Sequence, residues 1–291
     1  MRQTSKLRDG RTLEWADNGI KSSDALIFEA GTTLGLDAWN AWLHKAAAMG
    51  VRAISINRPG VGSSSNHEGR QIIDDSADIL DLVEILGITK FVAVGWSGGG
   101  GRALGAAFFD QCVAVHTIAC IPWQDPNDSH WMVTVTPQRH ELTTASRADF
   151  EELKRRRGGT IEDDRKVTSE DMLAALPSFV ANFEEFKNDY RVFAEDFSAS
   201  IREALVHGPD ADAHDYAANI NLWGFRLEDV SKPVTLWHGE LDDDVEFFYG
   251  EYNQSRIPGS TLIRLEGLGH IDIIVEARDR ILNAAIASLK E

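Results

Sequence analysis

The sequence predicts an α/β fold: a mainly parallel central sheet with helices on both faces and a helical insertion. Short apolar, β-branched runs alternate along the chain with segments in which apolar residues recur at helical spacing. Such alternation is typical of right-handed βαβ crossovers, which build parallel sheets. The alternation fails between residues 122 and 228, where helical patterns rich in aromatic and acidic residues replace the strands. We therefore expect a core domain formed by residues 1–121 and 229–291, with a helical cap, or lid, at residues 122–228.

Six segments are expected to form buried strands, because each is an apolar run that stops at glycine, proline or a polar cluster. In chain order they are 24–31, 51–60, 90–98, 113–122, 232–240 and 260–270. Helices are expected between them, at about 37–48, 71–86, 98–109, 246–256 and 276–289. A chain of 291 residues, 43% of them hydrophobic, is long enough to bury the core that this arrangement requires.

Charge and composition narrow the partners and the location. The net charge of −17 repels phosphate backbones and anionic lipid surfaces, so we expect no nucleic-acid and no membrane partner. The chain has no run of eighteen apolar residues, and its first residues lack the apolar segment of a signal peptide. Two cysteines, Cys112 and Cys120, are too few for a disulfide framework and are interpreted as small buried residues. The sequence thus favours a cytoplasmic protein, and it leaves the oligomeric state open.

Two charged stretches are interpreted as structural. The basic run of residues 155–157 precedes Gly158 and Gly159, which predicts a solvated last helical turn where cations suit the helix dipole. The stretch "GPDADAHD", residues 208–215, offers carboxylates and a histidine to a metal, but it lacks the glycine and the closing glutamate of an EF-hand. Acids directly after Gly-Pro suit the start of a helix instead. We therefore expect no metal and no cofactor.

The glycine-rich stretch "VGWSGGGGRALG", residues 94–105, admits two readings. Gly98, Gly100 and Ala103 satisfy the dinucleotide pattern G-x-G-x-x-A, but the first glycine follows a serine and no acidic residue ends the next strand. The rival pattern is G-x-S-x-G, with Ser97 at its centre. A nucleophile on a tight strand-to-helix turn needs small residues two positions before and after it. The backbone N–H of Gly98, at the start of the helix, would then be free to meet a developing oxyanion.

A serine hydroxyl needs a base, usually histidine, that is itself oriented by a buried carboxylate. His270 ends the last predicted strand, in "GLGH", and Asp242 lies just past the preceding strand, in "HGELDDDV". Asp243 and Asp244 stand beside Asp242, and only register against a motif separates the three.

The order Ser97, Asp242, His270 resembles that of the α/β-hydrolase superfamily. The motif H-G-x-x-D-x-x-V is matched from His238 to Val245, and "NRPGVGSS", residues 57–64, is similar to the superfamily turn D-R-P-G-x-G-x-S. The resemblance covers most of the chain outside the insertion. It implies that Ser97 is the nucleophile, that His270 is the general base and later the general acid, and that Asp242 fixes the imidazole tautomer.

The resemblance also implies a second oxyanion donor, which by position is the backbone N–H of Thr32 beside that of Gly98, with Thr33 as the alternative. Two departures stand out. Ala30 replaces the histidine that usually opens the oxyanion loop, so the hydrogen bonding of this loop must differ. Asn57 replaces the usual aspartate, and we interpret this change as structural.

For several residues near these motifs, a role in packing is the alternative to a role in the site. His238 is interpreted as structural. Trp96 either lines the pocket or packs under the turn, and the sequence does not separate the two. Trp123 and Trp223 are candidates for the pocket, although most aromatic residues of the insertion are expected to form its own core.

The sequence therefore predicts a serine hydrolase that acts on carboxylic esters or lactones with an apolar acyl part of modest size. In the superfamily that the chain resembles, members that open epoxides or displace halide use an aspartate at the position of Ser97, so the resemblance implies neither of these two reactions. Two alternatives stay open: a hydrolase of carbon–carbon bonds or small amides that uses the same three residues, and a non-catalytic protein that binds a small ligand.

Overall fold

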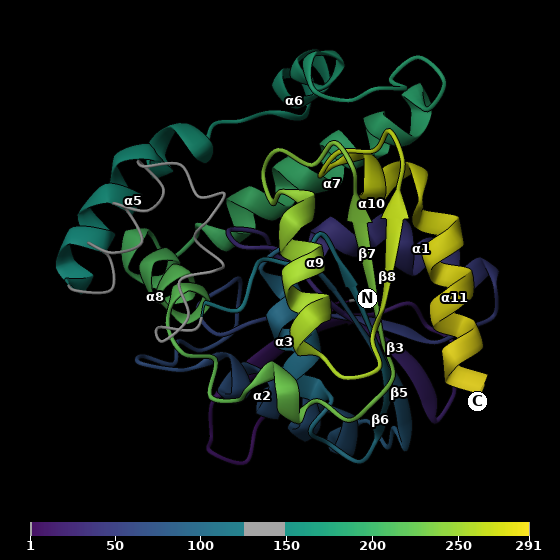
Figure 1. The fold of residues 1–291 in the computed structure, drawn as a ribbon. Coiled ribbons are helices and arrows are strands. Elements are labelled where there is room, and N and C mark those ends of the chain that lie inside the picture. Colours follow the sequence, from purple (N-terminus) through teal and green to yellow (C-terminus); the bar gives the residue numbers. More distant parts are fainter. Residues whose placement is uncertain (1, 125–148, 291) are drawn as a thin grey trace.

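The computed structural model describes residues 2–124 and 149–290, and they form an eight-stranded sheet with helices on both faces (Figure 1). The order of the strands across the sheet is β1-β2-β4-β3-β5-β6-β7-β8, and β3 to β8 run parallel. The bounds of the strands are β1 Arg2–Lys6, β2 Thr12–Asp17, β3 Asp24–Glu29, β4 Ala53–Asn57, β5 Lys90–Trp96, β6 Cys112–Ile118, β7 Val234–Gly239 and β8 Thr261–Leu265. The predicted fold class is confirmed, and all six predicted strands are present.

The two N-terminal strands are the main addition to the predicted sheet. β1 pairs antiparallel with β2, and β2 pairs antiparallel with β4. β1, with the sequence RQTSK, is mostly exposed and carries no apolar run. A polar strand at a sheet edge resists pairing with other chains, but it gives no hydrophobic period from which it could be predicted.

Helices cover both faces of the sheet, so the core has two halves. One half lies under α1 (Asn40–Ala48), α10 (Asp272–Glu276) and α11 (Arg278–Lys290). The other lies under α2 (Ile72–Ile85), α3 (Gly99–Ala106) and α9 (Phe247–Arg256). Figure 1 shows α9 and α11 on opposite sides of β7 and β8. Cys112 and Cys120 are buried, as predicted, and burial raises the pKa of the Cys112 thiol to about 12.

Four α-helices of the described chain lie between β6 and β7, and we call them the inserted helices. Their bounds are α5 Phe150–Asp164, α6 Ser169–Ala175, α7 Lys187–Ala204 and α8 Pro209–Ile220. In Figure 1 the arrowheads of β7 and β8 point toward the end of the sheet where α6 and α7 lie. The first part of the predicted insertion, residues 125–148, lies outside the described residues. None of the helices in the described ranges is both long and apolar enough to cross a bilayer.

A buried ionic cluster joins α8 to the core of the molecule. Asp215 of α8 accepts hydrogen bonds from Arg58, at 2.5 and 2.7 Å, from Arg70 at 3.0 Å and from Arg102 at 2.8 Å. Arg102 also donates to Asp75 of α2 at 2.8 Å. The side chains of all five residues are at most 3% exposed. Such a cluster is costly to break, because the removal of one charge leaves its partners buried and unpaired.

Glu29, at the end of β3, is buried beside this cluster, and its ionisation links stability to pH. Burial raises the pKa of the Glu29 carboxyl to about 8, although the positive charge of Arg102 opposes the shift. In the unfolded chain a glutamate titrates near pH 4.3, to within about a unit. Between these two values the folded protein holds a proton that the unfolded chain has lost. Raising the pH across this window therefore lowers the free energy of unfolding.

We expect Glu29→Gln to flatten the dependence of stability on pH between about pH 5 and pH 8, because the amide does not titrate. The measurement is urea unfolding of both proteins at several pH values in this window. The matched control is Glu251→Gln, at an exposed position on α9, which should keep the pH dependence of the original chain. Parallel curves for the original chain and Glu29→Gln would contradict the assignment of this titration to Glu29.

Candidate active site

Ser97 stands on a strained turn between β5 and α3. Its φ angle is +53°, in the left-handed region that non-glycine residues rarely adopt. A Cβ atom on Gly95 would lie 2.2 Å from the carbonyl oxygen of Gly99, and one on Gly99 would lie 2.2 Å from the carbonyl oxygen of Glu29. Neither position accepts a side chain, so the two glycines of the G-x-S-x-G pattern are the steric condition for the turn, as the sequence predicts.

The next two glycines, Gly100 and Gly101, are explained by packing inside the first turn of α3. A Cβ atom on Gly100 would lie 2.4 Å from Sγ of Cys120, and one on Gly101 would lie 3.1 Å from the indole of Trp223. Both glycines let α3 approach its neighbours closely. They do not widen the site for a ligand.

The structure brings His270 and Asp242 together, although they are 28 residues apart. Nδ1 of His270 lies 2.8 Å from Oδ2 of Asp242, which is hydrogen-bonding distance. Oδ1 of Asp242 accepts the backbone N–H groups of Asp244, at 3.1 Å, and Val245, at 2.8 Å. The carboxylate is therefore fixed on both sides. This geometry leaves Nε2 of the His270 ring for a proton from another group.

The neighbours of Asp242 and His270 take other places. The side chain of Asp243 is exposed, whereas Asp242 is only 5% exposed. Nε2 of His238 lies 2.6 Å from the carbonyl oxygen of Val245, and burial lowers the pKa of the His238 ring. A neutral His238 that donates to this carbonyl holds the loop in which Asp242 sits. The arrangement agrees with a structural role for His238.

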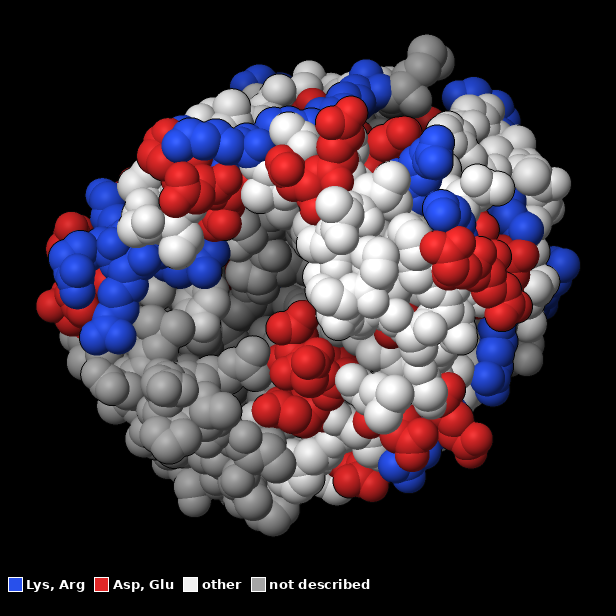
Figure 2. All heavy atoms as spheres, turned by 90° about the horizontal axis from the view of Figure 1, so that it is seen from above, with Lys and Arg blue, Asp and Glu red and all other residues white. Residues whose placement is uncertain are grey.

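Ser97 and His270 line the same cavity, which has a volume of about 670 Å³. The inserted helices contribute part of its wall, through residues of α5, α7 and α8. Figure 2 shows the molecule hollowed at this end, with acidic side chains beside the hollow. Apolar side chains next to the serine and histidine include Trp96, Ile121, Phe197, Ile201, Ile220 and Ile271. A cavity of this size and lining suits a small organic molecule.

A model of the alpha/beta hydrolase fold family matches residues 24–277. The chain belongs to the alpha/beta hydrolase fold family. It is also 30% identical, over 96 residues, to a bifunctional esterase/perhydrolase of Acinetobacter calcoaceticus. That match covers 33% of this chain and 35% of the relative. The matched stretch is thus only about a third of either protein, and the substrate of the relative does not carry over with it.

Solved structures support the same fold over the full chain. An esterase from Exiguobacterium antarcticum has a TM-score of 0.71 and 16% identity, and the similarity covers 100% of both chains. A thermophilic esterase from Thermogutta terrifontis has a TM-score of 0.66 and 19% identity, over 100% of this chain and 98% of that chain. At such identities the similarity shows the fold alone.

The loop after β3, residues 30–35, begins with Ala30, the first of the two departures from the resemblance. Side chains of the inserted helices bond this loop. Asn219 of α8 donates to Oγ1 of Thr32 at 3.1 Å, and Arg157 of α5 donates to Oγ1 of Thr33 at 2.9 Å. The hydroxyl of Thr33 donates in turn to Asp212 of α8 at 3.0 Å. The loop predicted to carry an oxyanion donor is thus held by α5 and α8.

The second departure, Asn57, is explained by its neighbours. The side chain of Asn57 is buried, and its amide nitrogen donates to Glu14 at 2.8 Å and to Glu203 at 2.6 Å. Its amide oxygen accepts the backbone N–H of Leu36 at 2.7 Å. An ionised aspartate here could accept from Leu36 but could not donate to either glutamate, so the amide fits this site better.

The three tryptophans proposed for the pocket lie in different surroundings. Trp96 lines the cavity, and its ring centroid lies 5.4 Å from that of His270. Trp223 is fully buried in the core and packs against Gly101. Trp123 is nearly buried, and the guanidinium of Arg256 lies over its ring at 5.3 Å. Neither Trp123 nor Trp223 is among the described residues that line the cavity.

The interpretation of the basic run requires a correction at Arg157. α5 continues to Asp164, so residues 155–159 lie within the helix and not at its end. Arg155 pairs with Glu152 on the exposed side, at 2.7 Å. Arg157 points inward, pairs with Asp212 at 2.6 Å and lines the cavity. The inward position of Arg157 was not predictable from the sequence, because the three arginines differ only in the face of the helix that each one occupies.

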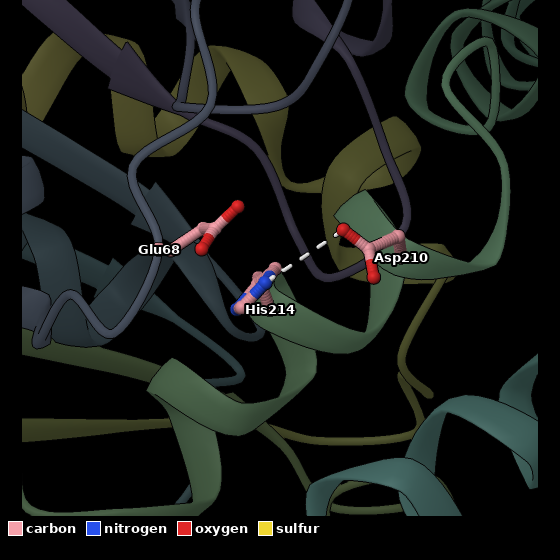
Figure 3. Close-up of side chains that lie close together, drawn as sticks. All are labelled: Glu68, Asp210 and His214. Atoms are coloured by element: carbon pink, nitrogen blue, oxygen red, sulfur yellow. Dashed lines mark ion pairs between the residues drawn. The ribbon is translucent and has the colours of Figure 1, made fainter.

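Asp210 and His214, for which the sequence offered a metal interpretation, lie near Glu68 (Figure 3). α8 begins at Pro209 with acids in its first turn, as predicted. One ligand atom from each of the three residues lies within 4.8 Å of the others, and Nε2 of His214 lies 3.8 Å from Oδ2 of Asp210. Nζ of Lys154 lies 2.5 Å from Oδ1 of Asp210, so a cation already neutralises this carboxylate. The cluster is best described as a contact between α5, α8 and the segment before α2.

Two important residues could not be assigned a role from the sequence. Arg102 is fully buried and donates to the carbonyl oxygen of Gly98 at 2.9 Å, which holds the turn after Ser97. Asn219 contacts both Arg102 and Thr32. An arginine inside the short apolar helix "GGGGRALGAA" is a sequence signal for a buried ion pair, but its partner in α8 is more than a hundred residues away.

Proposed function

We propose that this protein is a serine hydrolase of carboxylic esters, with Ser97 as nucleophile, His270 as general base and Asp242 as the residue that orients His270. The observation that carries the proposal is the placement of Ser97, on its strained turn, and of His270, with its bond to Asp242, on one cavity. The esterase named among the relatives supports the choice of ester substrates.

The steps follow from these positions. His270 takes the proton of the Ser97 hydroxyl, and the oxygen attacks the ester carbonyl to give a tetrahedral intermediate. The backbone N–H groups of Thr32 and Gly98 would stabilise its oxyanion. His270 then gives the proton to the leaving alcohol, and an acyl group remains on Ser97. Water, deprotonated by His270, attacks this acyl-enzyme and releases the acid.

The cavity supports an acyl part that is apolar and of modest size. Its volume of about 670 Å³ is in the range of small-molecule sites. The walls near Trp96 carry Phe197 and Ile201 from α7, and their side chains would exclude water from an alkyl group. Asp164 and Asp244 also line the cavity, and they would disfavour a substrate with several negative charges.

A hydrolase of carbon–carbon bonds or small amides would use the same three residues and stays the alternative. A panel separates the possibilities: 4-nitrophenyl esters of increasing acyl length, a lactone, a dienoic diketone and an aminoacyl anilide. We expect the highest kcat/KM on short or medium esters. An alkyl phosphonate should label Ser97, as mass spectrometry of the peptide that contains it would show. Fastest turnover of the diketone or the anilide would contradict the proposal, and so would an unlabelled Ser97.

A further inference from the structure

The side chain of Thr32 lies beside the position proposed for the oxyanion. A Cβ atom on Gly98 would lie 3.1 Å from the backbone nitrogen of Thr32 and 2.2 Å from its Oγ1. Thr32 also lines the cavity together with Ser97. Its hydroxyl and its backbone N–H therefore lie on the same side of the loop, toward Gly98. One residue thus presents two hydrogen-bond donors near the other proposed oxyanion donor, the N–H of Gly98.

The hydrogen bonds of Asn219 determine which way the Thr32 hydroxyl can donate. Nδ2 of Asn219 lies 3.2 Å from the backbone carbonyl oxygen of Asp215, which can only accept a hydrogen bond. Oδ1 of Asn219 faces Nη1 of Arg102 at 3.4 Å, and a guanidinium can only donate. These two partners fix the orientation of the amide, so the nitrogen is the atom that faces Oγ1 of Thr32 at 3.1 Å.

Oγ1 of Thr32 therefore accepts a hydrogen bond from Asn219, and its own hydrogen must point elsewhere. Among the described residues, no acceptor for that hydrogen accompanies the bond from Asn219. A hydroxyl that accepts one hydrogen bond also becomes a better donor, because the bonds polarise each other. Thr32 and Ser97 both line the cavity, so the cavity is the open direction for this hydrogen.

We propose that the Thr32 hydroxyl is a third oxyanion donor and that Asn219, on α8, is the residue that positions it. The inference rests on the proposed function, because the oxyanion arises only if Ser97 attacks a carbonyl. The ionic cluster at Asp215 holds α8 against Arg102, and Arg102 itself bonds the carbonyl oxygen of Gly98. Through these contacts the inserted helix α8 holds the loop that carries Thr32, and with it the backbone N–H and the hydroxyl of that residue.

The first test compares Thr32→Val with Thr32→Ser. Valine keeps the shape of threonine and the backbone N–H but removes the hydroxyl, whereas serine keeps the hydroxyl. We expect Thr32→Val to lower kcat on the best nitrophenyl ester by about 10- to 100-fold, with KM little changed, because the bond forms only in the transition state. Thr32→Ser should stay close to the original chain. Equal kcat for the valine and serine variants would overturn the inference.

The second test reverses the hydrogen bond from Asn219. In Asn219→Asp the carboxylate can only accept, so the Thr32 hydroxyl would donate to it and be lost to the oxyanion. We expect a fall in kcat similar to that of Thr32→Val. The double variant should lose little more than either single variant, because both remove the same bond. Losses that multiply in the double variant would overturn the role of Asn219.

Two further measurements distinguish the loss of an oxyanion donor from a loss of folded protein. Titration of Ser97 with the phosphonate gives the concentration of folded sites, and kcat is calculated on that concentration. A trifluoromethyl ketone, which forms an anionic adduct with a serine, should bind more weakly to Thr32→Val than to Thr32→Ser, a difference that a merely structural role would not produce. If the original chain hydrolyses no ester, both the proposed function and this inference fail. If it is active and the two Thr32 variants behave alike, only this inference fails.

Discussion

Replacement of Ser97 by alanine is expected to abolish nearly all ester hydrolysis, with a fall in kcat of about 10⁴- to 10⁶-fold. Alanine fits the turn as serine does, so the cavity and its proposed oxyanion donors should remain. Without the hydroxyl, no acyl-enzyme can form, and only slow direct attack by water is left. The measurement is single-turnover and steady-state hydrolysis of the best nitrophenyl ester from the panel, together with phosphonate labelling.

The matched control is Ser255→Ala, on the exposed side of α9 and outside the described lining of the cavity. It should hydrolyse the ester at the original rate and should still be labelled at Ser97. Hydrolysis by Ser97→Ala at a rate near that of the original chain would remove Ser97 from the mechanism. The ester would then be cleaved by another group, and the proposed function would have to be abandoned.

The second large effect is expected for Asp242→Asn, with a fall in kcat of about 10⁴-fold and a much smaller change in KM. The amide nitrogen would donate toward Nδ1 of His270, where the carboxylate accepts at 2.8 Å. The ring would then carry its proton on Nε2 and could not take one from Ser97. The carboxylate also stabilises the imidazolium that forms during attack, and the amide cannot do so.

Asp243→Asn makes the same chemical change one residue along, at an exposed side chain. Activity of this variant should be close to that of the original chain. A large loss in Asp243→Asn together with full activity in Asp242→Asn would contradict the assignment. The pair therefore tests the choice among three consecutive aspartates, which the sequence could make only by register against a motif.

Much of the core fold could be predicted because short stretches of sequence, by their apolar runs and glycine positions, indicate strands and turns without reference to the rest of the chain. Buried parallel strands are continuous apolar runs, and each of the six predicted segments contains a strand, although most strands end two to five residues before the predicted segment does. The turn at Ser97 was readable because a tight strand-to-helix crossing excludes side chains at Gly95 and Gly99, whatever the rest of the chain does. The β1–β2 hairpin was missed, since β1 is polar and has no apolar run.

The sequence could predict only those site residues whose role follows from their type and from their position directly after a strand. Ser97, Asp242 and His270 each follow a strand, and parallel strands bring their carboxyl ends to one edge of the sheet. The inward turn of Arg157 was not predictable, because which face of an inserted helix meets the core depends on how that helix packs. For the same reason the sequence could not tell which tryptophan lines the cavity.

The sequence by itself determined the fold class, the strained turn and the order of the three proposed catalytic residues, since these depend on local sterics and strand periodicity. Only the tertiary structure decided what holds the loop after β3. Asn219, Arg157 and Asp212 bond that loop from helices more than a hundred residues away along the chain. Contacts between segments so distant leave no periodic pattern in either one. They depend on how the inserted helices pack, and the ionic cluster around Asp215 is one contact that holds α8 in place.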